Sequence, residues 1–166
     1  MNNFNLTMKK INALVFIVVV IAAAFSSCKD KEPKLTLQQY LVAPTNGWVF
    51  ESIIYTDPFD GSTGDLTQDT TAFKACDLDN AIVFTSDFKY SVNGNTKCDA
   101  NEPAVLDNGG WAINGDNSQF SITSDVEGPL LTLVNFSIDA NHIIGQSSSF
   151  AGRPVVAQIT MKKYAP

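Results

Sequence analysis

The sequence is poor in the residues on which nucleic-acid binding and much enzyme chemistry depend. It has one histidine, three cysteines and 11 basic residues against 17 acidic residues, for a net charge of −6. Nucleic-acid binding needs Lys and Arg to neutralise phosphates, so this balance argues against a nucleic-acid partner. A long apolar run is also missing. The longest, Ile11 to Phe25, has about 15 residues, whereas a helix that crosses a bilayer needs roughly 20.

This apolar run lies where a secretion signal is expected. Two lysines precede it and two serines follow it, directly before Cys28. The order of basic, apolar and small residues is typical of a signal peptide. We therefore predict a signal over residues 1–27, with Met1 or Met8 as its start. The alternative, a permanent transmembrane helix, is disfavoured by the shortness of the run.

The junction FSSC, at residues 25–28, resembles the lipobox of Gram-negative prolipoproteins, with Phe25 where a leucine is usual. The resemblance implies cleavage before Cys28 and acylation of this cysteine, with palmitate among the chains. Several acyl chains suffice for stable anchoring, because each buried methylene contributes about 0.8 kcal/mol. We therefore expect a lipid-anchored protein of the outer membrane. The alternative is ordinary secretion with Cys28 unmodified.

Residues 28–34 are predicted to be the lipidated cysteine and a flexible tether. The stretch KDKEPK after Cys28 contains a proline and no apolar residue, so it cannot bury surface. Lysine and acidic residues directly after the cysteine resemble the pattern of lipoproteins displayed on the outer surface, although Lys31 interrupts the acidic pair. The pattern leaves both the outer surface and the periplasmic face open.

The rest of the chain, residues 35–166, suits one domain. Loss of the signal would remove two lysines and no acidic residue, which leaves 9 basic against 17 acidic residues and a net charge of −8. About 139 residues would remain, enough for a single stable core.

Two cysteines remain in the mature chain, Cys76 and Cys98. An even number in an oxidising compartment predicts a disulfide, and closing a loop of about 22 residues would stabilise the fold by roughly 3 kcal/mol. The alternative is a metal site with Asp77, Asp79 and Asp99, but no histidine or further cysteine lies at ligand spacing. We therefore expect neither a metal nor a cofactor.

Alternation of apolar and polar residues predicts an all-β domain. One short helix is expected over Leu35 to Leu41, stopped by Pro44. The residues assigned to the inner faces of the strands are Trp48, Phe50 and Ile54; Ile82 and Phe84; Tyr90 and Val92; Trp111 and Ile113; Phe120 and Ile122; Leu130, Val134, Phe136 and Ile138; Ile144 and Phe150; and Val155, Ala157, Ile159 and Met161. The sequence NGDNS at residues 114–118 is a strong hairpin signal. About eight short strands must close or stack to hide their edges, which favours a barrel or a sandwich.

From about residue 47 onwards the chain resembles the lipocalin-like domains of Gram-negative bacterial lipoproteins. The matching positions are Gly47-Trp48 at the first strand, Cys76 before Asp79, Phe84 and Tyr90, KCD at residues 97–99, Pro103, and Gly110-Trp111. The stretch Asp57 to Thr71 departs from the pattern by lengthening the first connection. The resemblance implies an up-and-down β-barrel of about eight antiparallel strands with a short N-terminal helix. It also implies pairing of Cys76 with Cys98.

A lipocalin-like barrel holds a small apolar molecule when its interior is left unfilled. The candidate ligand-binding residues are Trp48, Phe50, Phe84, Tyr90, Trp111, Phe120, Phe136 and Phe150. Their alternative role is a packed core, which such numerous bulky side chains favour. A ligand would then be small or held near the barrel mouth.

No pattern predicts a catalytic site. His142 adjoins a turn, and the serines at residues 147–149 have neither a nucleophile elbow nor an evident base. Four aspartates, Asp57, Asp60, Asp65 and Asp69, could gather a calcium ion, but their spacing does not match the calcium loop.

Two functions from different classes therefore stand. The first is a carrier or sensor that binds a small hydrophobic or amphipathic molecule at the cell envelope. The second is a non-catalytic scaffold or interaction module that docks onto another envelope protein through its outer face or the loop at residues 57–71. A fold alone does not decide between them.

Overall fold

The structure, a computed structural model, describes residues 34–148 and 156–166. Cys28, Phe150 and Val155 lie outside the described residues. The chain divides into two compact units, Met1–Lys34 and Leu35–Pro166, and every element below belongs to the second. Within residues 34–148 and 156–166, the buried core residues all belong to this second unit, which therefore has a core of its own. No helix among the described residues is long and apolar enough to cross a membrane.

The second unit consists mainly of strands. Its helical elements are α2 (Leu37–Val42), the 3-10 turn η1 (Leu66–Gln68) and α3 (Ala75–Leu78). Its strands are β1 (Trp48–Thr56), β2 (Thr63–Asp65), β3 (Ala81–Phe84), β4 (Lys89–Asn93), β5 (Val105–Ile113), β6 (Gln119–Ser124), β7 (Gly128–Ile138), β8 (His142–Ser147) and β9 (Val156–Lys163).

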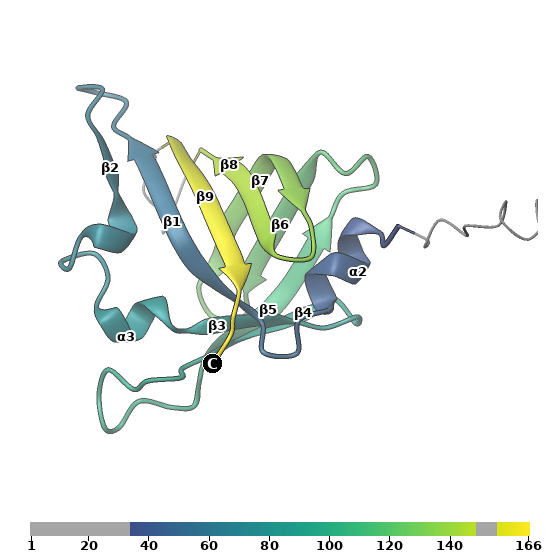
Figure 1. The fold of residues 1–166 in the computed structure, drawn as a ribbon, viewed down its shortest axis with the longest axis horizontal. Helices are drawn as coiled ribbons and strands as arrows, with labels where there is room; N and C mark the ends of the chain where they lie inside the picture. The colour runs from purple at the N-terminus through teal and green to yellow at the C-terminus, as the bar shows by residue number, and fades with distance from the viewer. Residues whose placement is uncertain (1–33, 149–155) are drawn as a thin grey trace, which may run out of the picture. The chain divides into compact units, whose positions relative to one another are not determined.

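Eight of these strands form a closed antiparallel barrel (Figure 1). Strands β3 to β9 pair in chain order, and β1 closes the ring by pairing with β9 along its whole length, from Trp48 opposite Lys163 to Thr56 opposite Val156. The ninth strand, β2, is an addition to the edge of β1. The predicted all-β class, the up-and-down barrel and the short N-terminal helix are confirmed.

The helix α2 is defined by its caps and attached to the barrel by one buried hydrogen bond. Thr36 Oγ1 accepts from Gln39 N at 3.2 Å, and Gln39 Oε1 accepts from Thr36 N at 2.8 Å, which is a complete capping box. Trp48 Nε1 donates to the Leu41 carbonyl oxygen at 2.8 Å, and both residues are fully buried. This bond satisfies the polar atom of the largest buried side chain and holds α2 against the barrel.

The predicted inner face of β1 is wrong beyond Phe50, because the strand contains a β-bulge. The pairing with β9 shifts between Phe50 and Ser52, which adds one residue and reverses the alternation. As a result Ile53 is fully buried, whereas Ile54, which we expected to point inward, is 42% exposed.

The expected face of β7 is wrong in part for the same kind of reason, and that of β8 is wrong although its pairing with β9 is regular. The register of β7 against β8 shifts just after Val134, where Asn135 has a φ of +49°. Before this bulge Leu133 is buried and Val134 is 41% exposed, the reverse of the expected phase. In β8, Ile143 is buried and Ile144 is 37% exposed. Strict alternation describes a strand only up to its first bulge.

These registers can be tested with two neighbouring substitutions. We expect Ile53→Ala to lower the free energy of unfolding by about 2–5 kcal/mol, because it removes a fully buried side chain from the core. Ile54→Ala should cost only about 0.5 kcal/mol, because Ile54 lies on the outer face. Denaturant unfolding measures both. If the two substitutions lowered stability equally, or Ile54→Ala lowered it more, the β-bulge in β1 would be contradicted.

Candidate functional site

A cavity of about 360 Å³ opens where strands β1 and β3 separate. It extends into the barrel interior as far as Ile122 and Leu131, which are buried and face each other across β6 and β7. Its lining consists of Phe50, Ala72, Phe73, Asp77, Asn80, Ile82, Tyr90, Val92, Ile122, Leu130 and Leu131. The lining is therefore mostly apolar, with a few polar groups contributed by the segment before β3 and by β4. This is the composition that small-molecule sites usually have.

The cavity exists because the seam between β1 and β3 is short. The two strands pair only at Trp48 and Ile82, and β1 is next paired on this edge by β2, from Ile54 onwards. The close approach at the start of the seam requires Gly47, whose φ is +81°, because a Cβ there would lie 2.5 Å from the Ile82 carbonyl oxygen. The segment between β2 and β3 covers the rest of the opening.

Asp65 attaches this covering segment to β1. Its Oδ1 accepts from Ile53 N at 3.1 Å, and from Thr67 N and Thr67 Oγ1 at 3.0 and 2.8 Å. Partial burial acts to raise the pKa of Asp65, but these hydrogen bonds outweigh it and hold the pKa below its ordinary value. The carboxylate therefore supplies the backbone of β1 with an acceptor where no neighbouring strand does.

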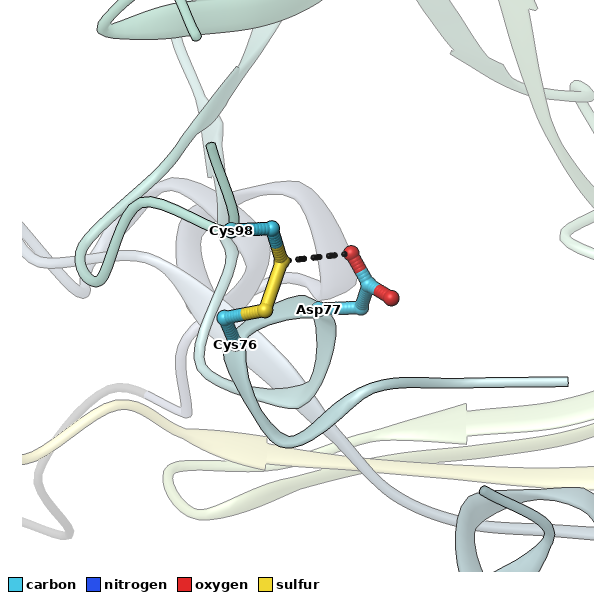
Figure 2. Close-up of side chains that lie close together, drawn as sticks. All are labelled: Cys76, Asp77 and Cys98. Atoms are coloured by element: carbon cyan, nitrogen blue, oxygen red, sulfur yellow. Dashed lines mark hydrogen bonds between the residues drawn. A yellow bond between two sulfur atoms is a disulfide. The ribbon is translucent and has the colours of Figure 1, made fainter. Parts of the chain in front are cut away.

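The disulfide predicted from the two cysteines is present beside the cavity. Cys76 in α3 is bonded to Cys98 in the β4–β5 connection, with a Cα–Cα distance of 5.4 Å (Figure 2). It ties the covering segment to the connection between β4 and β5. Asp77 Oδ1 lies 3.2 Å from Cys98 Sγ, and within the described part of the chain these three residues are the one group close enough to share a metal ion. Because a disulfide sulfur is not a thiolate, the bonded cysteines are not the ligands that a zinc site needs.

Three of the eight candidate aromatic residues lie in a packed core and not in the cavity. Trp48, Phe84 and Phe120 are buried and do not line it. The ring of Phe84 lies 6.4 Å from Tyr90, 6.1 Å from Trp111 and 5.7 Å from Phe120 between centroids. Tilted and edge-to-face contacts of this kind are favourable between aromatic rings. These three residues therefore fit the alternative role given to them from the sequence, which was to fill the interior of the barrel as a packed core.

The remaining candidates are divided. Phe50 and Tyr90 line the cavity, and Phe136 is partly buried with its ring 6.1 Å from that of Phe120. Trp111 lines a second hollow of about 590 Å³, which it shares with the start of α2, Phe88 and the β5–β6 turn. Phe150 is outside the described residues. In Figure 1, α2 and α3 lie on opposite sides of the barrel.

Sequence reasoning missed the part of the lining that comes from the segment before β3. Ala72, Phe73, Asp77 and Asn80 belong to no alternating run, so periodicity gave no reason to place them against the barrel. The aliphatic lining could have been found, since Ile82, Val92 and Ile122 were assigned to inner faces and only their role was overlooked. The candidate ligand-binding residues were chosen among aromatic residues only, and several of these lie in the filled part of the barrel interior.

Tyr90 joins the cavity to a hydrogen-bonded group. Its hydroxyl donates to Asp107 Oδ2 at 2.6 Å, and Ser124 Oγ donates to Asp107 Oδ1 at 2.7 Å. Burial of the phenol, and then its bond to the Asp107 carboxylate, raise the pKa of Tyr90 well above its ordinary value. The adjacent Gly109 allows this packing, because a Cβ there would lie 3.0 Å from the Tyr90 ring and 2.1 Å from the Thr123 carbonyl oxygen.

The four aspartates considered for calcium are engaged in their own turns. Asp57 Oδ1 accepts from Phe59 N at 2.7 Å, Asp60 Oδ1 from Ser62 N at 2.8 Å, and Asp69 Oδ1 from Thr71 N at 2.9 Å. Asp65 binds β1 as described above. These are turn-forming bonds of the usual kind for aspartate, and in residues 34–148 no three of the four carboxylates come close enough to share an ion.

The other polar candidates lie apart from the cavity. His142 Nε2 is 3.8 Å from Glu51 Oε2, with both side chains about two-fifths exposed. Ser147 is buried, at the end of β8. Neither residue lines the cavity, and they lie at opposite ends of β8, so the described structure does not bring them together as a nucleophile and its base.

No protein-family model matches this chain, and no curated protein is similar to it. The barrel fold is therefore supported by the structure alone, whereas the resemblance to lipocalin-like lipoprotein domains stays a prediction.

The raised pKa of Tyr90 predicts a loss of stability in alkali. The unfolded tyrosine titrates at about pH 10, so the stability that this group contributes is complete below pH 10 and is lost as the pH rises above it. We expect Tyr90→Phe to cost about 1 kcal/mol at pH 7, from the lost hydrogen bond, and to show a shallower loss above pH 10. Urea unfolding at a series of pH values measures this. Tyr164→Phe, which changes a phenol outside the cavity, should keep the wild-type slope. If Tyr90→Phe lost stability above pH 10 as steeply as the wild type, Tyr90 would not be the group responsible for that loss.

Proposed function

We propose that this protein is an envelope-anchored lipoprotein whose barrel binds a small hydrophobic or amphipathic molecule. The observation that carries the proposal is the cavity at the seam between β1 and β3, with its apolar walls and few polar groups. Sites for small molecules have this character, and their volumes begin at about 300 Å³. Burial of an apolar ligand surface there would supply the binding free energy, at about 25 cal/mol for each Å² removed from water.

The volume limits the size of the ligand. At roughly 30 Å³ for each non-hydrogen atom, the share that a water molecule takes in the liquid, a cavity of about 360 Å³ holds about a dozen such atoms. A single short acyl chain or a compact ring system fits this limit. A phospholipid exceeds it, so the proposal excludes transport of whole lipids inside the cavity.

The proposed anchor supports a role at the membrane surface. If Cys28 is acylated, the seven residues of the tether place the start of the domain within about 25 Å of the bilayer. An amphipathic molecule that partitions into the membrane would then be concentrated near the cavity. No reaction is part of the proposal, since the polar residues of the cavity suit orientation of a ligand and not turnover.

A second candidate, the interaction module, is favoured by one observation. Phe59, in the connection between β1 and β2, is 91% exposed. A large exposed aromatic side chain on a projecting loop is typical of a residue that becomes buried against a partner. This candidate predicts that Phe59→Ser releases a stoichiometric envelope partner and that apolar probes bind nowhere in the domain.

Obstruction of the cavity tests the carrier proposal. We expect the anchor-free domain, residues 29–166, to bind one molecule of the neutral fluorescent probe 1-naphthylamine, a two-ring compound within the size limit of the cavity, measured by fluorescence titration. Ala72 is exposed at the rim, so Ala72→Trp should fill the opening and weaken binding at least tenfold while the fold is kept. Ala112→Trp makes the same change on the outer face of β5 and should bind normally. Equal binding by both variants would contradict the site, and no binding by the wild type would contradict the function.

The anchor is tested separately in whole cells. We expect Cys28→Ser to abolish incorporation of labelled palmitate and to move the protein out of the detergent phase, because the acylated sulfur is lost. Ser27→Ala keeps a small residue at the junction and should retain the label. Labelling of the Cys28→Ser chain would contradict the assignment of the anchor to this cysteine.

A further inference from the structure

The described lining of the cavity contains one acidic side chain and no basic one. The acidic residue is Asp77, in α3, and the neighbouring polar group is the amide of Asn80. The hydroxyl of Tyr90 is already bonded to Asp107. An amphipathic ligand that entered this cavity would therefore meet a single formal charge, which is negative.

This charge is not neutralised by a cation. Asp77 Oδ2 accepts from Lys74 N at 2.8 Å, and the ion pairs among the described residues both involve Glu51 and not Asp77. The other oxygen, Oδ1, faces Cys98 Sγ at 3.2 Å (Figure 2). A sulfur in a disulfide has no hydrogen to donate, so this contact leaves the acceptor capacity of Oδ1 unused.

The carboxylate is also held in place before any ligand arrives. Its bond to Lys74 N caps α3, and the neighbouring Cys76 is tied by the disulfide to Cys98 in the β4–β5 connection. A charged acceptor that is fixed at the edge of an apolar cavity binds a cation more strongly than a freely moving one, because less conformational entropy is lost on binding.

We propose that the cavity selects amphiphiles with a cationic head group, with the ammonium at Asp77 and the apolar body between Phe50, Ile122 and Leu131. This deepens the function proposed above and rests on it. An ammonium group can donate hydrogen bonds to Oδ1, whereas a carboxylate head group would be repelled by Asp77 and by the net charge of −8 on the chain without its signal. The ligand class is therefore hydrophobic amines of about a dozen non-hydrogen atoms, and fatty acids are disfavoured.

The test compares three ligands with the same chain and different head groups. Decylamine, decanol and decanoate are titrated at pH 7 against the anchor-free domain, residues 29–166, carrying 1-naphthylamine, and displacement of the probe is measured. We expect the amine to bind at least tenfold more tightly than the carboxylate, with the alcohol between them. The preference should shrink as salt is added, because exposed charge pairs are screened.

Two variants separate the charge from the structure. Asp77→Asn removes the charge and keeps an oxygen that can accept from Lys74 N, so we expect about fivefold weaker binding of decylamine and a change of less than twofold for decanol. Asp79→Asn removes a charge two residues away, on a side chain that accepts from Thr96 N and does not line the cavity, and should leave all three affinities unchanged.

The outcomes also separate this inference from the function on which it rests. Two results would contradict selection by charge while leaving the proposed binding site supported, provided that decanol and the probe bind. The first is that decanoate binds as tightly as decylamine, and the second is that Asp77→Asn leaves decylamine binding unchanged. If none of the three ligands displaces the probe and the probe itself does not bind, the proposed function fails as well. Circular dichroism and intact mass confirm that each variant keeps its fold and its disulfide.

Discussion

The structure depends on how the backbone hydrogen-bonding groups on the two edges of strand β1 find partners. On one side β1 pairs with β9 over its whole length, and this pairing closes the barrel. On the other side it meets β3 at a single residue pair, so several backbone groups between Trp48 and Ile54 would be left without a partner strand. Unpaired strand edges are costly and prone to association, and a closed barrel avoids them only where its ring is complete. The incomplete seam is therefore the position that the rest of the chain must cover.

The covering is supplied by the long connection from β1 to β3. Its aspartate at position 65 replaces a strand as the acceptor for Ile53 N, and the disulfide holds its far end against the β4–β5 connection. A loop covers a seam less tightly than a strand would, because its side chains do not interdigitate at a fixed spacing. The cavity lies where this looser covering meets the wall of the barrel. The stretch that departs from the pattern of lipocalin-like domains thus begins the connection that forms the proposed site.

Sequence reasoning reached the fold through local signals and failed where the decisive contacts are distant. Alternation at Ile82 and Phe84, or at Ala157 and Ile159, reports burial directly, because these strands are regular. The bulges after Phe50 and Val134 are set by the register of partner strands, so no window of sequence contains their cause. The disulfide was predictable because compartment and cysteine count are properties of the whole chain. The part of the cavity lining that precedes β3 was not predictable, since its position depends on how the gap between β1 and β3 is covered.

The packing of the interior determines where selectivity can reside. The rings of Phe84, Trp111 and Phe120 fill the barrel beside Tyr90, so the proposed ligand would gain apolar contact only on the side of Tyr90 that lines the cavity. The hydroxyl of this tyrosine donates its hydrogen to Asp107, so it has no donor left for a head group. The core therefore contributes hydrophobic surface without chemical discrimination. In the proposed function, discrimination would fall to the polar groups of the covering segment. These groups can change without disturbing the core, because their positions depend on a cap and a disulfide and not on the alternation of the strands.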